Sequence, residues 1–469
     1  MVQREEKKKT SPRRKAVESM AVEHPDAAGI DIGSRSHWVA VPADRDPEAV
    51  REFGGFTGDL HHLADWLKRC GIKTVAMEST GIYWIPLYDV LEMRGLKVLL
   101  VNASHLRNVP GRKSDVMDCQ WIQQLHRFGL LRGSFRPPEE ILELRAYMRQ
   151  RERLIVDASR HVQHMQKALL EMNVQLHHVL SDLTGVTGMA IVRAIVGGER
   201  DSTKLAELRD RRCRQPKERI AAALQGTFKR EHLFVLAQSL RAYDMHQEML
   251  RECDQLIEQK LGELAAQSEA PPEPCPPPRH GSPKANQPRF EIQSPLHRIC
   301  DGVDVTQIEG LAPATALNLV AEVGRDMSRW PTEKHFTSWL NLAPGTRITG
   351  GKRISGRRGP SKNRAGLALR QTAVSVGRTD TALGSFYRRL AARGGPARAA
   401  VATARKIAIL YYRALKYGHA FVEIGCAAYE QEQRERQLRA LNKRAATLGY
   451  QLSPRSVEPA AADDRREVT

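Results

Sequence analysis

The sequence predicts an α/β domain at the N-terminal end, then a long helical region and a mostly helical C-terminal domain. Between residues 27 and 136, short apolar runs alternate with amphipathic stretches, as they do in α/β domains. Between residues 137 and 268, apolar residues recur at intervals of three, four and seven, which indicates long helices. A chain of 469 residues is also too long for one ordinary core. We therefore expect several domains.

The first part of the α/β domain is predicted to be a hairpin with a third strand. The apolar runs at 28–33 and 37–41 are expected to pair, and 51–56 is expected to add the third strand. A helix is predicted at 57–70, because its leucines recur at helical spacing.

The second part alternates strands and helices. Residues 72–78 and 96–102 are predicted to be buried strands, and helices are predicted at 82–95 and 114–129. Three strands followed by this alternation is the order expected of a ribonuclease-H-like sheet.

Changes of composition divide the chain further. Arginines dominate the polar face of the helical region. Such a basic helical hairpin can either form a dimerisation coil or bind nucleic acid. We expect a basic arm at 1–26, the α/β domain at 27–136, a helical hairpin or coiled-coil region at 137–268, a proline-rich linker at 269–294, a C-terminal domain at 295–425 and a charged tail at 426–469.

The charge balance favours a nucleic-acid partner. The chain has 73 Lys+Arg against 54 Asp+Glu, a net charge of +19. Basic side chains that neutralise phosphates release counterions, so a polyanion is the natural ligand. A ribosome-associated or merely basic surface protein is the alternative.

Other classes are disfavoured. There is no apolar run of the roughly 18 residues that a membrane span needs, and no signal peptide is visible. The seven cysteines form no C-x-x-C pair, which argues against a zinc site or a disulfide framework. This cysteine usage fits a reducing cytoplasm, so we expect a cytoplasmic protein.

Four acidic residues lie within a predicted strand, at the end of a strand or at the start of a helix. Asp31 lies inside the first apolar strand, where a charge is costly unless it is paired or metal-bound. Glu78 ends a buried strand, and Asp115 and Asp118 fall on one face of the helix after the last strand. In a sheet of this order the four acids would gather at one edge.

Crowded carboxylates favour a divalent cation. Mg²⁺ prefers carboxylate oxygens, and one or two such ions would suit phosphoryl transfer. The alternatives for single residues are structural: Asp115 as a charge at a helix N-terminus and Glu78 as a surface acid at a strand end.

In the C-terminal domain, residues 308–324 predict a helix, a glycine turn and a second helix that starts at Pro313. Such a helix-hairpin-helix motif can hold a DNA phosphate with its turn amides. A tight helical turn without a ligand is the alternative.

A basic segment follows at 342–370. Its glycines allow close approach to a phosphate chain, and Thr349 and Ser355 place hydroxyls among its cations. A flexible phosphate-contacting loop without covalent chemistry is the alternative. The candidate nucleic-acid-binding residues are Arg347, Lys352, Arg353, Arg357, Arg358, Lys362, Arg364 and Arg370.

Taken together, these pieces resemble one family, the IS110-type insertion-sequence transposases, which are bridge-RNA-guided recombinases with a DEDD RuvC-like domain. The matching runs follow one another in family order over roughly residues 27–425. They are GIDIGSRSHWVAV, AMESTGIYW, the K-S-D-x-x-D of Lys113 to Asp118, IEGLAPATA, LAPGTRITGGK and FYRRLAARGGPARAAVATARKIA.

The resemblance implies roles for particular residues. Asp31, Glu78, Asp115 and Asp118 would be the four metal-binding acids of a RuvC-like domain. The family's nucleophile is a serine just before a glycine, and this position is Thr349 here. Position favours Thr349, whereas the less hindered alcohol favours Ser355, so both stay candidates.

The resemblance also implies partners. They are donor and target DNA, a structured guide RNA, and further copies of the chain in a dimer or tetramer, whose acid and hydroxyl sites can come from different subunits. Two alternatives remain: a RuvC-like junction endonuclease that acts by metal-assisted hydrolysis, and a catalytically inactive nucleic-acid-binding scaffold.

Overall fold

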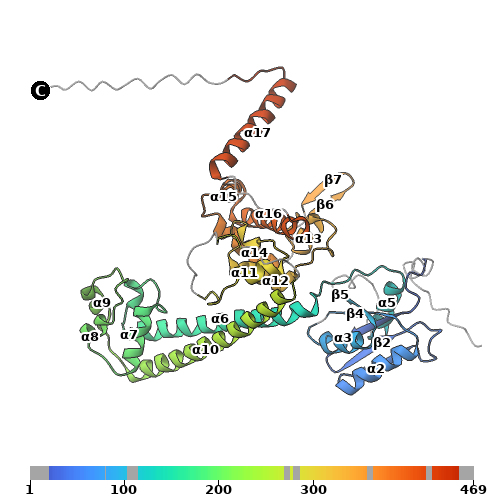
Figure 1. Ribbon diagram of the computed structural model, residues 1–469, viewed down its shortest axis with the longest axis horizontal. Helices are drawn as coiled ribbons and strands as arrows, with labels where there is room; N and C mark the ends of the chain where they lie inside the picture. The colour runs from blue at the N-terminus through green and yellow to red at the C-terminus, as the bar shows by residue number, and fades with distance from the viewer. Residues whose placement is uncertain are drawn as a thin grey trace, which may run out of the picture. The chain divides into compact units, whose positions relative to one another are not determined.

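The computed structural model describes residues 21–79, 81–102, 115–268, 275–277, 286–355, 363–418 and 425–453. The chain divides into two compact units, Met1–Arg136 and Pro137–Thr469, and each is described by itself (Figure 1). None of the helices in these ranges is at once long and apolar enough to span a membrane.

The N-terminal unit contains the mixed five-stranded sheet that the pattern predicts. The strand order is β3-β2-β1-β4-β5. β1, β2 and β3 pair antiparallel, whereas β4 and β5 run parallel to β1. This arrangement fits a ribonuclease-H-like domain. The strands are β1 (Ala27–Ile32), β2 (Ser36–Ala40), β3 (Val50–Gly54), β4 (Thr74–Glu78) and β5 (Lys97–Val101).

Helices pack on the sheet through two separate cores. α2 (Thr57–Arg69) and α3 (Trp84–Met93) share one core with the side chains of Ile30 and Met77. α5 (Asp115–Arg127) packs through Ile122 against Ala76 and Val101, in a second core. Because successive strand residues point to opposite faces, the two cores lie on opposite sides of the sheet.

In the second unit, two long helices form an antiparallel pair that we call the arm (Figure 1). They are α6 (Glu139–Glu171) and α10 (Arg230–Ala266). Polar contacts join the start of each helix to the end of the other: Lys260 forms an ion pair with Glu143 at 2.6 Å, and His232 Nδ1 lies 3.2 Å from a carboxylate oxygen of Glu171. The long helices predicted between residues 137 and 268 are present, although loops and short helices separate them.

A small helical subdomain is inserted between the two arm helices. We call residues 172–229 the tip subdomain. It has its own apolar core, which includes Leu176, Ile191, Leu205 and Ile220. Its helices are η1 (Leu176–His178), α7 (Val186–Val196), α8 (Ser202–Glu207) and α9 (Lys217–Ala223).

The C-terminal domain is mostly helical, as predicted. Tyr411 and Tyr412 of α16 are fully buried beside Phe336, and the Tyr412 hydroxyl donates to the carbonyl of Trp330 at 2.8 Å. The elements are α11 (Gln293–Ile299), η2 (Val305–Gln307), α12 (Pro313–Val323), α13 (Glu333–Trp339), β6 (Thr346–Thr349), β7 (Lys352–Ser355), α14 (Arg364–Val376), α15 (Ala382–Gly394), α16 (Pro396–Tyr417) and α17 (Cys426–Thr447).

A buried acid docks this domain on the arm. Glu322 of α12 is 8% exposed and accepts from Arg149 of α6 through both carboxylate oxygens, each at 2.7 Å. Arg145 lies 3.3 Å from the same carboxylate. Because both guanidinium groups come from α6, the charge pairing holds α12 against that helix.

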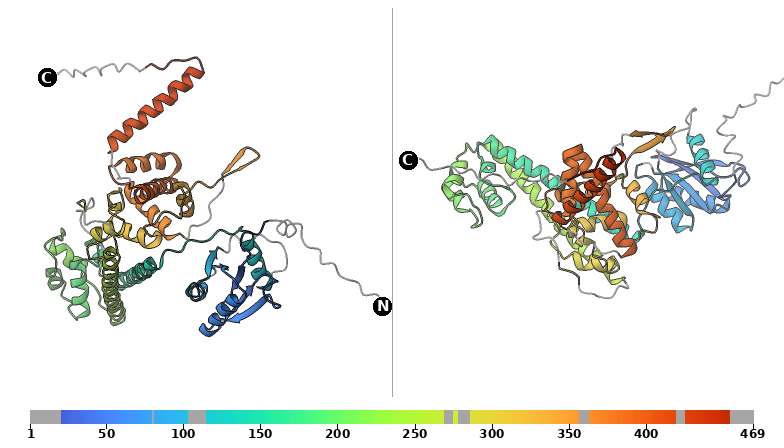
Figure 2. Two further views of the ribbon diagram at one scale, coloured as in Figure 1. Left: turned by 45° about the vertical axis from the view of Figure 1, so that its right-hand side comes forward. Right: turned by 90° about the horizontal axis from the view of Figure 1, so that it is seen from above.

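Two local predictions differ from the structure. The segment that carries Thr349 forms a β-hairpin, which projects from the helices (Figure 2). Gly350 and Gly351 both have positive φ (+55° and +74°), and so they close the tight turn between the two strands. The element before the Gly310 turn is the single 3₁₀ turn η2 and not an α-helix. A Cβ at Gly310 would collide with the side chains of Val376 and Thr372, so this turn packs on α14.

Candidate active site

Asp31 and Glu78 lie at the same end and on the same face of the sheet. Ile30 of β1 pairs with Met77 of β4 in parallel register, so Asp31 and Glu78 occupy the next step of the two strands. The Ile30 and Met77 side chains belong to the core under α2 and α3. The two acids therefore face the side covered by α5, where both are partly buried.

Helix α5 runs antiparallel to β1 and very close to it. The Gln123 side chain donates to the carbonyl of Ala27 at 3.2 Å. A Cβ at Gly29 would lie 2.5 Å from the carbonyl oxygen of Cys119 and would collide with the backbone nitrogen of Gln123. Only a glycine leaves room for the helix backbone at this point.

This packing brings the beginning of α5 level with Asp31. From Gln123 back to Asp115 the helix rises by about 12 Å, and from Ala27 to Asp31 the strand advances by about 13 Å. Asp118 is partly buried in the first turns of the helix. Asp115 is the first helical residue, and its side chain lies outside the described residues.

The pKa of the buried Cys119 thiol is affected by two of the acids. Burial, with smaller contributions from the negative charges of Asp31 and Asp118, raises its pKa to about 12. Both carboxylates therefore lie near one thiol, although they come from different elements. The structure thus brings Asp31 and Asp118 together and places Glu78 on the strand beside them.

The chemistry of these donors fits a divalent cation, because carboxylate oxygens are the ligands that Mg²⁺ prefers. Among the described side chains, which exclude that of Asp115, no group of three or more His, Cys, Asp or Glu is arranged to hold a metal ion. The described geometry therefore supports a site at this sheet edge without completing its ligand set.

Gly29 was not among the predicted site residues. It touches no substrate, but it sets the distance between α5 and the strand that carries Asp31. A glycine inside an apolar strand, two residues before a buried acid, was the available signal, since such a glycine marks a close approach of another backbone.

The two candidate nucleophiles stand at opposite ends of the β6–β7 hairpin. Thr349 is exposed and pairs with Lys352 across the turn, whereas Ser355 pairs with Thr346 at the open end. Three strand steps separate these two ends, about 10 Å. A single scissile phosphate can therefore meet only one of them. The side chain of Ser355 lies outside the described residues.

The candidate phosphate-binding residues fall into three groups. Arg364 pairs with Glu152 of α6 at 2.6 Å, and Arg370 is partly buried and donates to the carbonyl of Asn341 at 2.9 Å. Lys352 is exposed beside the hairpin turn. The remaining candidates have side chains outside the described residues: Arg347, Arg353, Arg357, Arg358 and Lys362.

Two family models match the chain, and most of the tip subdomain lies between the two matched regions. The first describes a transposase of the DEDD, IS110 type and matches residues 28–174. The second describes the transposase IS116/IS110/IS902 family and matches residues 304–388. The chain belongs to the IS110-type transposases. A search of curated proteins found no match.

The transposase is thus an enzyme that acts on DNA. Its first matched region covers the sheet with Asp31, Glu78 and Asp118, and its second covers the β6–β7 hairpin. A DEDD-type domain implies that the enzyme uses a divalent metal.

Proposed function

We propose that this transposase cuts and rejoins DNA with a magnesium site formed by Asp31, Glu78, Asp115 and Asp118 and a hydroxyl nucleophile from its C-terminal domain. The observation that carries the proposal is geometric: Asp31 and Glu78 occupy matching steps of β1 and β4, and α5, which carries Asp118, packs closely on β1. A bound Mg²⁺ would supply positive charge to the phosphoryl group in transit.

The protein's own part is to hold these acids in place. Asp31 is fixed by the strand ladder of β1, and Asp118 by the helix that Gly29 admits to the sheet. Rigid elements hold the acids in position despite their mutual repulsion. The carboxylates are therefore preorganised to bind a cation.

In the proposed step, the hydroxyl oxygen of Thr349 or Ser355 attacks the phosphorus of a DNA phosphodiester. An oxygen–phosphorus bond to the protein forms, the bond to one deoxyribose oxygen breaks, and that oxygen takes up a proton while the attacking hydroxyl loses one. The reverse attack by a deoxyribose hydroxyl rejoins the DNA. One ester replaces another in each direction, so no external energy source is needed.

The acids are tested by Asp115→Asn combined with Asp118→Asn. We expect recombination to be abolished while DNA binding largely survives, because the amides keep the shape but lose the charge that binds the metal. Asp44→Asn, which changes an exposed acid of the same unit, serves as the control. Intact recombination by the double variant would favour an inactive scaffold instead.

The hydroxyl is tested by trapping a covalent protein–DNA adduct with Thr349→Ala and Ser355→Ala. We expect an adduct with the unmodified transposase and with one variant, and none with the other. If no form of the protein yields an adduct, the junction endonuclease that acts by hydrolysis is the better description.

We further propose that a structured RNA guides the enzyme on the nucleoid and that it works as a dimer or tetramer. The charge of +19 supports a second nucleic-acid partner. Sequencing of RNA that copurifies from cells should recover one discrete species encoded by the element. Recovery of bulk cellular RNA alone would contradict guidance.

The assembly can be tested by mixing. If the acids and the hydroxyl act from different subunits, the Asp115→Asn, Asp118→Asn protein and the protein without its nucleophile should recover recombination together. Two inactive proteins that stay inactive when mixed would place both groups in one subunit.

A further inference from the structure

The tip subdomain carries arginines that its fold does not use. Arg211 and Arg214, in the loop between α8 and α9, and Arg219, on α9, are all exposed. Within the described part of the chain, none of the three has an ion pair or a hydrogen bond from its side chain. Nearby cations do have partners: Arg212 lies 2.8 Å from Asp210, and Lys217 pairs with Glu207.

The loop that presents these arginines has a defined shape. The Arg209 guanidinium donates to the carbonyls of Cys213 and Gln215, at 3.2 and 2.8 Å, and so closes the loop on itself. The amide of Asp210 donates to the Thr187 hydroxyl at 3.0 Å, which ties the loop to α7. Unpaired cations on an ordered loop lose little entropy when they bind phosphates.

A groove lies at the other end of the α8–α9 pair, about 9 Å away by the length of α8. Its volume is about 550 Å³. The Arg200 guanidinium lies over the Phe228 ring, 5.1 Å from its centre, and is held there by the carbonyls of Ile195 and Glu199. The groove is lined by Asn173, Arg200, Ser202, Leu224, Gln225, Gly226, Thr227 and Phe228.

The groove combines the side chains that recognise an unpaired base. A phenylalanine ring and a guanidinium plane can stack on any base, and the amides of Asn173 and Gln225 can hydrogen-bond to base edges. Phe228 also has a positive φ of +42°. Bulky residues rarely adopt this conformation, and strained residues of this kind cluster at binding sites.

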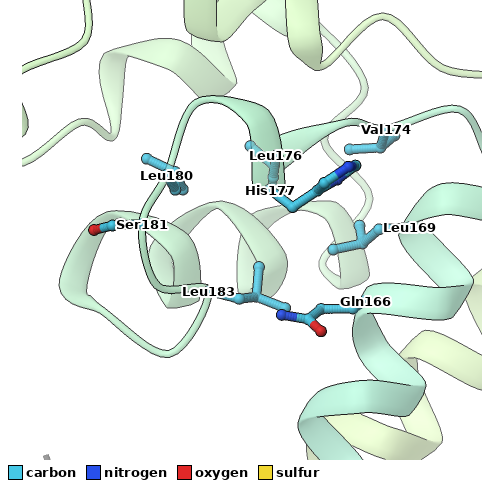
Figure 3. Close-up of a pocket in the computed structure, with 8 residues that line it drawn as sticks. All are labelled: Gln166, Leu169, Val174, Leu176, His177, Leu180, Ser181 and Leu183. Carbon is cyan, nitrogen blue, oxygen red and sulfur yellow. The ribbon is translucent and has the colours of Figure 1, made fainter. Parts of the chain in front are cut away.

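A second cavity in the same subdomain has a different character. Its volume is about 100 Å³, much smaller than that of the groove. Leucines dominate its lining, which comes from the end of α6 and from the segment around η1 (Figure 3). It shares no lining residue with the groove.

We propose that the tip subdomain binds a single-stranded segment of nucleic acid. Arg211, Arg214 and Arg219 hold its phosphates, and the groove beside Phe228 takes one unpaired base. Single-stranded DNA and RNA share this chemistry. The site is separate from the acids and the hydroxyls, so it stands or falls independently of the proposed recombination step.

The phosphate contacts are tested with the full-length protein carrying Arg211→Ala and Arg214→Ala. The control, Arg160→Ala with Arg193→Ala, removes the same charge from arginines that are paired with Asp157 and Asp244. Binding of single-stranded DNA, single-stranded RNA and duplex DNA of equal length is measured from low to high salt. The slope of log K against log salt should fall by about 1.4 for a single strand, which corresponds to two lost phosphate contacts.

The outcomes separate the possibilities. A reduced slope on DNA alone or RNA alone names the ligand. An unchanged slope on both single strands, or a fall no larger than in the control, overturns the proposal. An equal fall on duplex DNA also overturns it, because the surface would then be a duplex contact.

The base site is tested with Phe228→Leu, which keeps an apolar side chain. Binding of a single strand that contains 2-aminopurine should weaken by roughly 5- to 150-fold, the range for one lost base stack. The change in 2-aminopurine fluorescence on binding should disappear. If the fluorescence change persists, the base does not stack in this groove. Catalysis is not read in either assay, so failure of the metal and hydroxyl proposal would leave these results unaffected.

Discussion

At Gly29 the strand β1 has no side chain, and the backbone of α5 occupies that space. We expect Gly29→Ala to lower the free energy of unfolding by about 1–3 kcal/mol, because the new methyl group must push the helix away. It should also reduce recombination, since Asp118 moves with the helix. Urea unfolding and a recombination assay measure the two effects.

Gly58→Ala is the matched control, because nothing lies within 4 Å of a Cβ at that position of α2. It should be neutral or slightly stabilising, since alanine favours a helix over glycine. Equal losses of stability in the two variants would mean that close packing of α5 is not the cause.

His126, at the end of α5, is 3% exposed, and its ring lies 2.9 Å from the Thr74 hydroxyl. Burial lowers its pKa from 6.5 to about 4. Between these two values the unfolded chain binds a proton that the folded protein does not. The free energy of unfolding should therefore fall as the pH drops from about 6.5 to about 4, by up to about 3 kcal/mol.

His126→Gln should make this part of the pH profile flatter, because glutamine keeps a polar group but does not titrate. His62→Gln, at an exposed position, should leave the profile unchanged. Denaturant unfolding at several pH values measures both. A slope that survives His126→Gln must come from another group.

Site residues could be predicted from the sequence only where the neighbouring residues made them unusual. Asp31 and Glu78 stood out because acids are unusual in and after buried strands, and the structure places both on one face. Gly29 was missed, because its importance depends on α5, which lies far along the chain. The choice between Thr349 and Ser355 was open, since nothing local shows which hydroxyl a phosphate would meet.

At the scale of elements, the arm is held by a polar pair inside its helix interface. The Arg151 and Asp254 side chains are only 9% and 16% exposed and lie 2.5 Å apart. Arg151→Ala leaves the Asp254 charge without its partner in a poorly solvated place. We expect a loss of about 3–5 kcal/mol in the free energy of unfolding, measured with urea.

Two further variants check this explanation. Arg160→Ala breaks an exposed pair with Asp157 on α6 and should cost under about 1 kcal/mol. Arg151→Met with Asp254→Leu should recover much of the lost stability, because no charge is left unpaired. A double variant as unstable as Arg151→Ala would point to lost shape rather than lost charge.

The periodic elements were predicted correctly, and the short irregular ones were not. Apolar spacing determines where α2, α6 and α10 lie, since burial of one face is their main source of stability. The β6–β7 hairpin was missed, although Gly350-Gly351 is a turn signal, because its strands are basic and lack an apolar face. η2 is too short to show a period.

For the whole molecule, division into two compact units predicts more than one step of thermal unfolding. Gly29→Ala should lower the midpoint of one transition and Arg151→Ala that of another, because their cores are separate. Scanning calorimetry of the full-length protein measures this. One transition that shifts as a whole with either variant would show that the units unfold together.

The order of the large elements could be predicted from the sequence, whereas the small helical insertion could not. Strand-helix alternation and long helical periods located the sheet and the arm, because each repeats over many residues. The small helical insertion between α6 and α10 was not foreseen. Its helices have 11 residues or fewer, and their stability depends on a shared core.

The arm has a length that matters for any ligand that touches both of its ends. From Arg149, where α12 docks, to Glu171 beside the tip, α6 rises by about 33 Å. One turn of B-form duplex covers about 34 Å. A DNA duplex that lay along the arm would complete about one helical turn between its ends, so both ends of the arm would face the same groove. Its footprint there would be about ten base pairs.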